Sequence, residues 1–405
     1  MGDLVDARTA ARRLGVDVRT LYAYVSRGSL RRVPGPDGRT SRYDSDELEL
    51  LARRSRPRTL PRPTASIDLV IATRVSAVAD GLVRYRGTDV LDLVAAGESF
   101  EAVAGLLWSA EGAATGPPEA WWLPGEQAAR VESVVRALGD GVPVAQRFAA
   151  ALAAASGAGS SGGPPGWAAS GRFIVATFIA ASGTGQGGGA SGDDDAAGYS
   201  VARRLWQRWS PLRASTARVR ALNTALVLLA EHELALSTLA VRVAASARAE
   251  PSGCVLAGLG ALSGPLHGDA ARIVRERLFR ERAARDETLA DQTLADQTLA
   301  GAPGFGHTVH RHGDPRAAPL LRVVSAIATP ADRDLIEGIC RRAPAPPTVD
   351  FTLGALCHVG RMPPEASTAI FATARTAGWI AHAAEEYAQP HLRFRGRAIT
   401  STRAG

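Results

Sequence analysis

The residues best suited to acid–base chemistry are histidines flanked by small or turn-forming residues. His232 lies in AEHELALST (230–238), His267 in SGPLHGDA (263–270) and His307 in PGFGHTVHRHGDPRA (303–317), while Asp350 in PTVDF (347–351) adds a carboxylate. Each histidine alone is explained as a hydrogen-bonded structural side chain. Their grouping with glycine, which lets backbone approach a ligand closely, instead favours a common site.

The run HTVHRHGD also permits a metal site. His307, His310, His312 and Asp314 are of the types that zinc accepts. We favour a site without metal, because no further ligand set for an open metal site is evident elsewhere in the chain.

The basic residues exclude one route to carbon–carbon bonds. All 47 are arginine, so no side-chain amine can form a Schiff base with a carbonyl substrate. Carbon–carbon bond formation would have to use an enolate made in another way. Arginine, in turn, offers forked donors that suit the carboxylates of a polyanionic substrate.

The elements that must position these residues are mainly helices. Segments such as SFEAVAGLLWSA and STARVRALNTALVLLAEHELALSTLAVRVAASA show helical periodicity, and alternating β-branched runs are scarce. Two Gly/Ser/Ala-rich stretches within 156–198 are expected to be loops, and TLADQTLADQTLA at 288–300 is a short tandem repeat without an assigned role. We therefore expect a nearly all-α catalytic part.

Composition indicates where the protein works. No long uncharged apolar run and no apolar signal core is present, so we expect a cytoplasmic protein that does not enter the membrane. Cys254, Cys340 and Cys357 are too few and too scattered for a disulfide framework or a spaced zinc site.

The N-terminal segment is basic and has its own pattern. The first 60 residues hold 13 Arg against 8 Asp plus Glu, which indicates a nucleic-acid partner. DARTAARRLGVDVRTLYAYV (6–25) predicts helix, turn and helix, and the following segment resembles the wing and third helix of MerR or excisionase-type domains. Duplex DNA would then be contacted by Arg19, Thr20, Tyr22, Arg39 and Arg42. The alternative is a basic docking module without a DNA role. Residues 55–65, rich in Arg and Pro, are the expected linker.

From Ile67 to Gly405 the chain resembles citrate synthase. The similar segments, in order, are DGLVRYRGTDVLDLVAAGESFEAVAGLLW (80–108), GPLHG (264–268), GFGH (304–307), DPRA (314–317), VDF (349–351) and ARTAGWIAHAAEE (374–386). The resemblance implies a mainly α fold. A large helical domain would comprise residues 66–268 and 361–405, and a small domain would comprise residues 269–360. Both would be preceded by a winged helix-turn-helix domain, which would comprise residues 1–54.

The resemblance also implies roles. Asp350 would be the base that removes a proton from the acyl-CoA methyl, His267 the donor to the resulting enolate, and His307 the residue that polarises the second substrate's carbonyl. Oxaloacetate would be bound by His232, Arg316, Arg375 and Arg395, and CoA by Arg311. The implied reaction joins acetyl-CoA to oxaloacetate and gives citrate and CoA, without a cofactor.

Two alternatives stay open: a 2-methylcitrate synthase that uses propionyl-CoA, and a DNA-binding regulator that senses these ligands. The resemblance further implies a homodimer in which Arg395 reaches the partner's site.

The sequence departs from the family at four places near these residues. GDAAR follows His267 where GGANE is usual, which puts Asp269 near the expected path of the CoA thioester. Ala235 replaces an Asn, His310-Arg311 replaces Tyr-Lys, and FRGRA replaces RPRA around Arg395. These departures bear on substrate choice and rate.

Overall fold

The computed structural model describes residues 4–14, 18–26, 30–35, 40–44, 69–79, 81–108, 121–139, 141–156, 166–182, 201–264, 267–286, 303–306, 310 and 313–395. The chain divides into two compact units, Met1–Ile71 and Ala72–Gly405.

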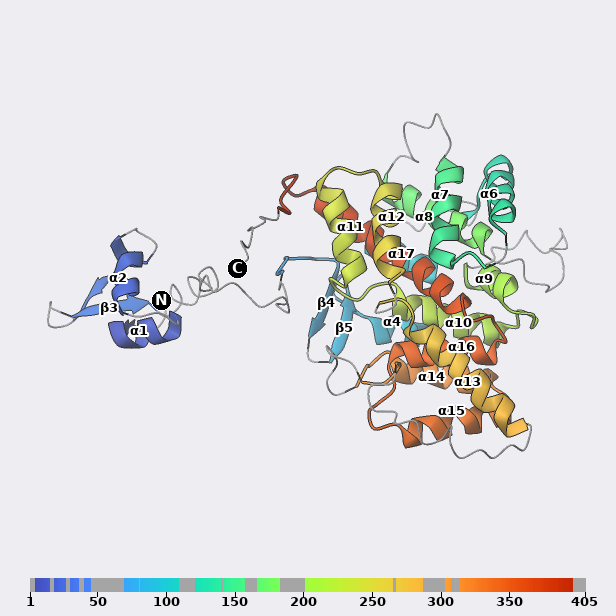
Figure 1. Ribbon diagram of the computed structural model, residues 1–405. Coiled ribbons are helices and arrows are strands. Elements are labelled where there is room, and N and C mark those ends of the chain that lie inside the picture. Colours follow the sequence, from blue (N-terminus) through green and yellow to red (C-terminus); the bar gives the residue numbers. More distant parts are fainter. Residues whose placement is uncertain are drawn as a thin grey trace, which may run out of the picture. The chain divides into compact units, whose positions relative to one another are not determined.

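The first unit contains two short helices and a small sheet (Figure 1). The helices are α1 (Ala7–Leu14) and α2 (Val18–Ser26), as the pattern of residues 6–25 predicts. Strands β1 (Leu4–Asp6), β3 (Ser41–Asp44) and β2 (Val33–Pro34) pair antiparallel in that order. Ala10 and Leu21 are fully buried in the core between these elements. The third helix and the linker expected from the sequence lie outside the described residues.

The second unit is mainly helical, as expected. Its described helices are α4 (Val90–Ala96), α5 (Phe100–Trp108), α6 (Gly125–Leu138), α7 (Val144–Ser156), α8 (Trp167–Ala181), α9 (Val201–Trp209), α10 (Thr216–Leu229), α11 (Leu236–Ser246), α12 (Pro251–Leu262), α13 (Ala270–Asp286), α14 (Ala317–Ile327), α15 (Pro330–Arg342), α16 (Val349–Val359) and α17 (Ala366–Tyr387). The strands β4 (Ser76–Ala79), β5 (Leu82–Tyr85) and β6 (Thr88–Asp89) form one short antiparallel sheet.

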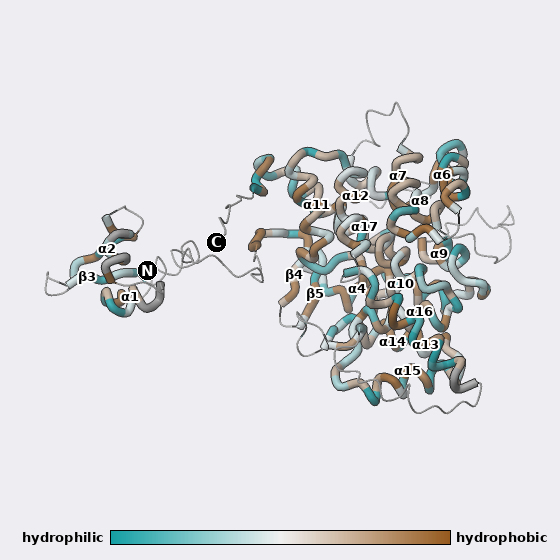
Figure 2. The backbone as a smooth tube through the Cα atoms, viewed as in Figure 1, coloured by the Kyte–Doolittle hydropathy of each residue, from teal (hydrophilic) through white to brown (hydrophobic). Residues whose placement is uncertain are grey.

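Helix α17 is the centre of this unit (Figure 1). It packs against α5, α7, α8, α10, α11 and α12, and also touches α13 and α16. Its sequence, ASTAIFATARTAGWIAHAAEEY, has small or apolar residues on every face, so neighbouring helices can approach from all sides. Arginine and glutamate instead accumulate on α13, which Figure 2 shows with teal stretches, like α6, at the edge of the unit.

Within the described residues, no helix is long and apolar enough to cross a membrane. Buried hydrophobic residues of the second unit form one continuous cluster that runs from Val75 to Ala383. The two Gly/Ser/Ala-rich stretches around α8 and the TLADQ repeat lie largely or wholly outside the described residues.

Candidate active site

A pocket of about 340 Å³ gathers residues that are far apart in the sequence. Its lining consists of His232, Glu233, Leu234, Ala235, Leu236, His267, Arg316, Val349, Asp350, Phe371 and Arg375. Five of these, His232, His267, Arg316, Asp350 and Arg375, are residues that the sequence singled out. They bring together two imidazoles, one carboxylate and two guanidinium groups.

The loop that carries His232 joins α10 to α11 and is fastened on both sides of the histidine. Glu231 Oε1 accepts a hydrogen bond from Ser76 Oγ (3.1 Å), and Glu233 Oε1 accepts one from Val78 N–H (3.0 Å). Both donors lie on β4. Glu233 has a left-handed backbone (φ 52°), a conformation that is costly for a residue with a side chain. The sheet therefore holds this loop against the pocket.

His232 forms a hydrogen bond with a second histidine. Its Nε2 lies 2.9 Å from Nε2 of His310, so one of these nitrogens carries the hydrogen and the other accepts it. Burial lowers the pKa of His310, which favours the neutral ring. The hydrogen bond between the two rings therefore fixes the orientation of the His232 ring.

His267 follows α12, and its Nε2 lies 2.9 Å from Ser237 Oγ on the first turn of α11. Burial, and then the nearby Arg375 guanidinium, lower the pKa of His267. The ring is therefore neutral at pH 7 and has one N–H to offer. If Ser237 donates to Nε2, that hydrogen is on Nδ1.

Asp350 is the second residue of α16, where the helix N-terminus favours a carboxylate. Val349 N–H, just before it, donates to Asp314 Oδ2 (2.9 Å), and Thr348 N–H donates to Gly304 O (2.9 Å). A Cβ on Gly304 would come within 2.7 Å of Val274, at a φ of +90°, so this position needs glycine for packing. The start of α16 is thus held by the segments that contain DPRA and GFGH.

Arg316 and Arg375 are both buried cations with different partners. Arg316 Nε and Nη2 donate to the two oxygens of Asp314, both at 2.9 Å. Burial alone would raise the pKa of Asp314, but the Arg316 guanidinium and these hydrogen bonds hold it well below its usual range. Since a guanidinium has five N–H donors, the outer edge of Arg316 can still bind a second carboxylate.

Arg375 lies on α17, where its Nε donates to Leu229 O (3.0 Å) and its guanidinium stands 4.8 Å from the ring centre of Phe371. Burial lowers the pKa of Arg375 from its very high ordinary value, but the group stays cationic because nearby Glu231 opposes the shift. A buried cation that faces a pocket is suited to a carboxylate ligand.

The remaining candidate residues from the sequence analysis either do not line this pocket or are not described by the structure. His307, His312 and Arg311 are outside the described residues. Arg395 is exposed in the segment after α17 and does not line this pocket. Asp269 does not line it either; its carboxylate accepts from Arg272 Nη2 (2.9 Å). Among the described residues, no group of three or more His, Cys, Asp or Glu is placed to hold a metal ion.

Of the N-terminal residues named above, Arg39 is outside the described part of the chain, and Arg19 and Thr20 are described only in backbone. Tyr22 on α2 is half exposed, and Arg42 on β3 donates from Nη1 to Leu4 O (3.3 Å).

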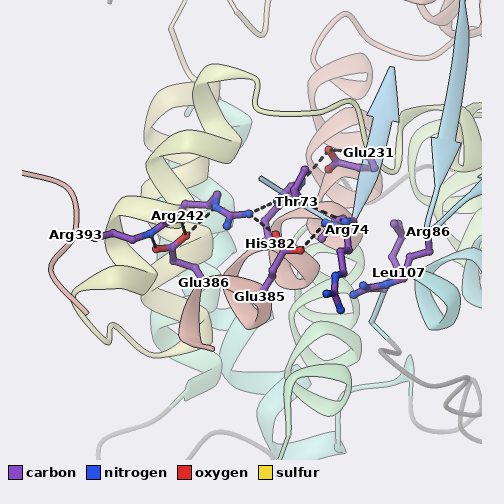
Figure 3. Close-up of polar contacts among 12 residues, drawn as sticks. Thr73, Arg74, Arg86, Leu107, Glu231, Arg242, His382, Glu385, Glu386 and Arg393 are labelled. Atoms are coloured by element: carbon purple, nitrogen blue, oxygen red, sulfur yellow. Dashed lines mark hydrogen bonds and ion pairs between the residues drawn. The ribbon is translucent and has the colours of Figure 1, made fainter. Parts of the chain in front are cut away.

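Sequence reasoning missed several polar residues that support the pocket. Glu231, Ser237 and His382 are all fully buried, and Figure 3 shows Glu231 and His382 among further ionic residues. For His382 a signal was available, because an imidazole within a helix that is otherwise small and apolar needs partners.

The chain resembles known proteins over its second unit. The sequence profile described as "Citrate synthase, C-terminal domain" matches residues 68–397. Citrate synthase 2 of Bacillus subtilis is 29% identical over 197 residues, which are 47% of this chain and 53% of that protein. The 2-methylcitrate synthase 2 of Corynebacterium glutamicum is 28% identical over 182 residues, 43% of this chain and 47% of that protein. The chain thus spans about half the length of these curated relatives.

A solved structure shares the fold. It is the citrate synthase of Thermoplasma acidophilum in a ternary complex with carboxymethyl coenzyme A and oxaloacetate. The TM-score is 0.64 at 22% identity, over 83% of this chain and 95% of that one.

Proposed function

We propose that this chain, which belongs to the citrate synthase family, condenses an acyl-CoA thioester with oxaloacetate and releases CoA. The observation that carries the proposal is that Asp350 and His267 line one pocket with Arg316 and Arg375. An enolate reaction on a dicarboxylate needs a base, an N–H donor and forked cations, and this pocket offers all three. The ligands named with the Thermoplasma acidophilum structure belong to the same reaction type.

The first step is a proton transfer from carbon. Asp350 would take a proton from the methyl carbon next to the thioester carbonyl, and the oxygen would become an enolate. His267 would donate its Nδ1–H to that oxygen, provided that Nε2 accepts from Ser237. A neutral imidazole, favoured by burial, is suited to this role because it can donate while Nε2 accepts.

The second step forms the carbon–carbon bond. The enol carbon would attack the keto carbon of oxaloacetate, whose oxygen would receive a proton. We assign that proton to His307, following the sequence match. Arg316 and Arg375 would hold the two carboxylates, and His232, fixed by His310, would orient the substrate. Water would then hydrolyse the citryl thioester. The reaction needs no cofactor, because CoA enters as part of a substrate.

The remaining family assignments extend this proposal. Arg311 would bind CoA, and the segment 269–360 would act as a small domain that closes over the pocket. We propose a homodimer, in which Arg395 would complete the partner's carboxylate site. Exposed apolar side chains on neighbouring surfaces support an interface: Val243 on α11, Leu256 on α12 and Leu392 after α17. An exposed Arg395 that lies outside the pocket of its own chain fits the same arrangement.

Acetyl-CoA is the proposed acyl donor, and propionyl-CoA is the second candidate. The similarity to the 2-methylcitrate synthase 2 of Corynebacterium glutamicum favours testing it. One additional methylene changes binding by only about 1–3 kcal/mol, so the ratio of kcat/KM values decides between them.

The N-terminal unit is proposed to be a winged helix-turn-helix that binds duplex DNA. Two packed helices, a small sheet and the net positive charge of the first 60 residues support this. The full chain should shift a DNA duplex in a gel at low salt. Binding should weaken steeply as salt is added, because the release of phosphate counterions into solution is then less favourable. No complex at any salt concentration would favour the docking-module alternative.

The proposed reaction is tested by release of CoA. Purified protein is mixed with oxaloacetate and acetyl-CoA, and free thiol is followed with a chromogenic disulfide. Thiol release that requires both substrates supports the function, and a parallel assay uses propionyl-CoA. Binding of oxaloacetate without any thiol release from either thioester would favour a sensor that regulates DNA binding.

A further inference from the structure

A chain of hydrogen-bonded polar groups runs from the exposed segment after α17, through the buried interior, to the loop that carries His232 (Figure 3). Arg393 donates to both oxygens of Glu386, and Glu386 also accepts from Arg242 Nε (2.9 Å). Arg242 Nη1 lies 2.8 Å from His382 Nδ1, and His382 Nε2 lies 3.2 Å from Glu231 Oε1. Arg242, His382, Glu386 and Glu231 are each 0% exposed.

The chemistry of Arg242 decides which nitrogen of His382 carries the hydrogen. A guanidinium only donates, so His382 Nδ1 has to be the acceptor. The hydrogen is then on Nε2, which points at Glu231 Oε1 and donates to it. A ring with hydrogens on both nitrogens would set N–H against N–H at the 2.8 Å contact with Arg242.

Glu231 depends on this donor. Its Oε1 accepts from Ser76 Oγ (3.1 Å) and lies 3.2 Å from His382 Nε2, and a carboxylate taken out of water needs such donors. Glu231 is thus a buried carboxylate whose position is set by α17 on one side and β4 on the other. His232 is the next residue along the chain, so the position of Glu231 fixes where the His232 ring enters the pocket.

We propose that His382 is a positioning residue for substrate binding: locked as the Nε2–H tautomer by Arg242, it holds Glu231 and, through it, the loop of His232. His382 does not line the pocket and touches no substrate. The inference deepens the proposed function, because the affected ligand is the oxaloacetate that His232 is assigned to bind.

Two substitutions of His382 separate positioning from general stability. In His382→Gln the side-chain amide nitrogen can take the place of Nε2–H and donate to Glu231, whereas His382→Leu fills the space and cannot donate. We expect His382→Leu to raise the KM for oxaloacetate by roughly tenfold or more, with a much smaller change in the KM for acyl-CoA. His382→Gln should recover most of the affinity for oxaloacetate.

His358→Leu is the matched control. His358 lies on α16, and its Nε2 contacts Asp332 Oδ1 (3.3 Å), away from the pocket lining. Its loss should lower the unfolding midpoint and leave both KM values unchanged. Equal changes in the two KM values for His382→Leu, or no recovery in His382→Gln when both variants are folded by circular dichroism, would overturn the proposal.

A second measurement does not depend on activity. In the full-length protein labelled with ¹⁵N-histidine, NMR correlations from ring nitrogens to carbon-bound hydrogens identify each tautomer. The signals lost in His382→Gln should be those of an Nε2–H ring. An Nδ1–H or doubly protonated ring would overturn the tautomer assignment. An Nε2–H ring in a protein that lacks turnover would instead count against the proposed function alone.

Discussion

Replacing Gly378 by alanine should weaken both the fold and the pocket, because α17 touches the His232 loop at this glycine. An added Cβ would lie 1.9 Å from Glu231 Oε2 and 2.7 Å from Ala230 O. Both distances are far inside van der Waals contact. Gly378 N–H also donates to Ala230 O (3.1 Å), so the helix and the loop cannot separate without losing this bond.

The size of the effect follows from three contributions. Alanine in the interior of a helix gains about 0.5–1 kcal/mol over glycine. Overpacking a tight contact costs about 1–3 kcal/mol. Moving the buried Glu231 carboxylate away from Ser76 and His382 costs about 1–3 kcal/mol more. We expect a net loss of about 3 kcal/mol in the free energy of unfolding, together with a raised KM for oxaloacetate.

The assay is urea unfolding followed by circular dichroism, with the KM for oxaloacetate measured on the folded variant. Gly260→Ala, on α12, is the matched control, because a Cβ there meets nothing within 4 Å and the residue is exposed. It should be as stable as the wild type or slightly more so. If Gly378→Ala unfolds at the same urea concentration as Gly260→Ala, Glu231 moves aside freely and the loop is not held by α17.

Four further outcomes are expected. Asp350→Asn should lower the turnover number about a hundredfold, with little change in oxaloacetate binding by calorimetry, since it removes the proposed base; near wild-type turnover would contradict the mechanism. Ser237→Ala should lower the turnover number about tenfold, because it removes the hydrogen bond that keeps the hydrogen of His267 on Nδ1. An unchanged turnover number would refute this role of Ser237. Arg395→Ala subunits mixed with Asp350→Asn subunits should recover about half the wild-type activity per heterodimer, because one of the two sites is intact. No recovery in confirmed heterodimers would refute the proposal that Arg395 completes the partner's site. Because burial lowers the pKa of His358 below the 6.5 of the unfolded chain, the unfolded state binds more protons, and stability falls as the pH drops from about 7. The loss is at most about 1.4 kcal/mol per pH unit for each such histidine. Unfolding midpoints should fall less steeply with acid in His358→Gln, and an equal slope would show that His358 is not held neutral.

The helical character of the second unit could be predicted from the sequence, because apolar residues at helical spacing form helices whose faces must be buried together. The residues of the pocket could also be named from their motifs. His267, Asp350 and Arg375 are residue types that enolate and carboxylate chemistry requires, and in the structure all three line the same pocket. Within GFGH, Gly304 has a packing role that the sequence did not indicate, because a Cβ there would come within 2.7 Å of Val274.

The partners of these residues were decided only by the tertiary structure. Nothing in the spacing of Ser76, Glu231 and His382 indicates that they meet, because β4, the loop before α11 and α17 are separated by long stretches of chain. Asp314 shows the same limit: as part of HTVHRHGD it could be a metal ligand, yet both of its oxygens accept from Arg316. Residue type determines what chemistry a side chain can perform. Burial and the choice of hydrogen-bond partner, which depend on how distant segments pack, determine its protonation, its tautomer and the direction in which it points.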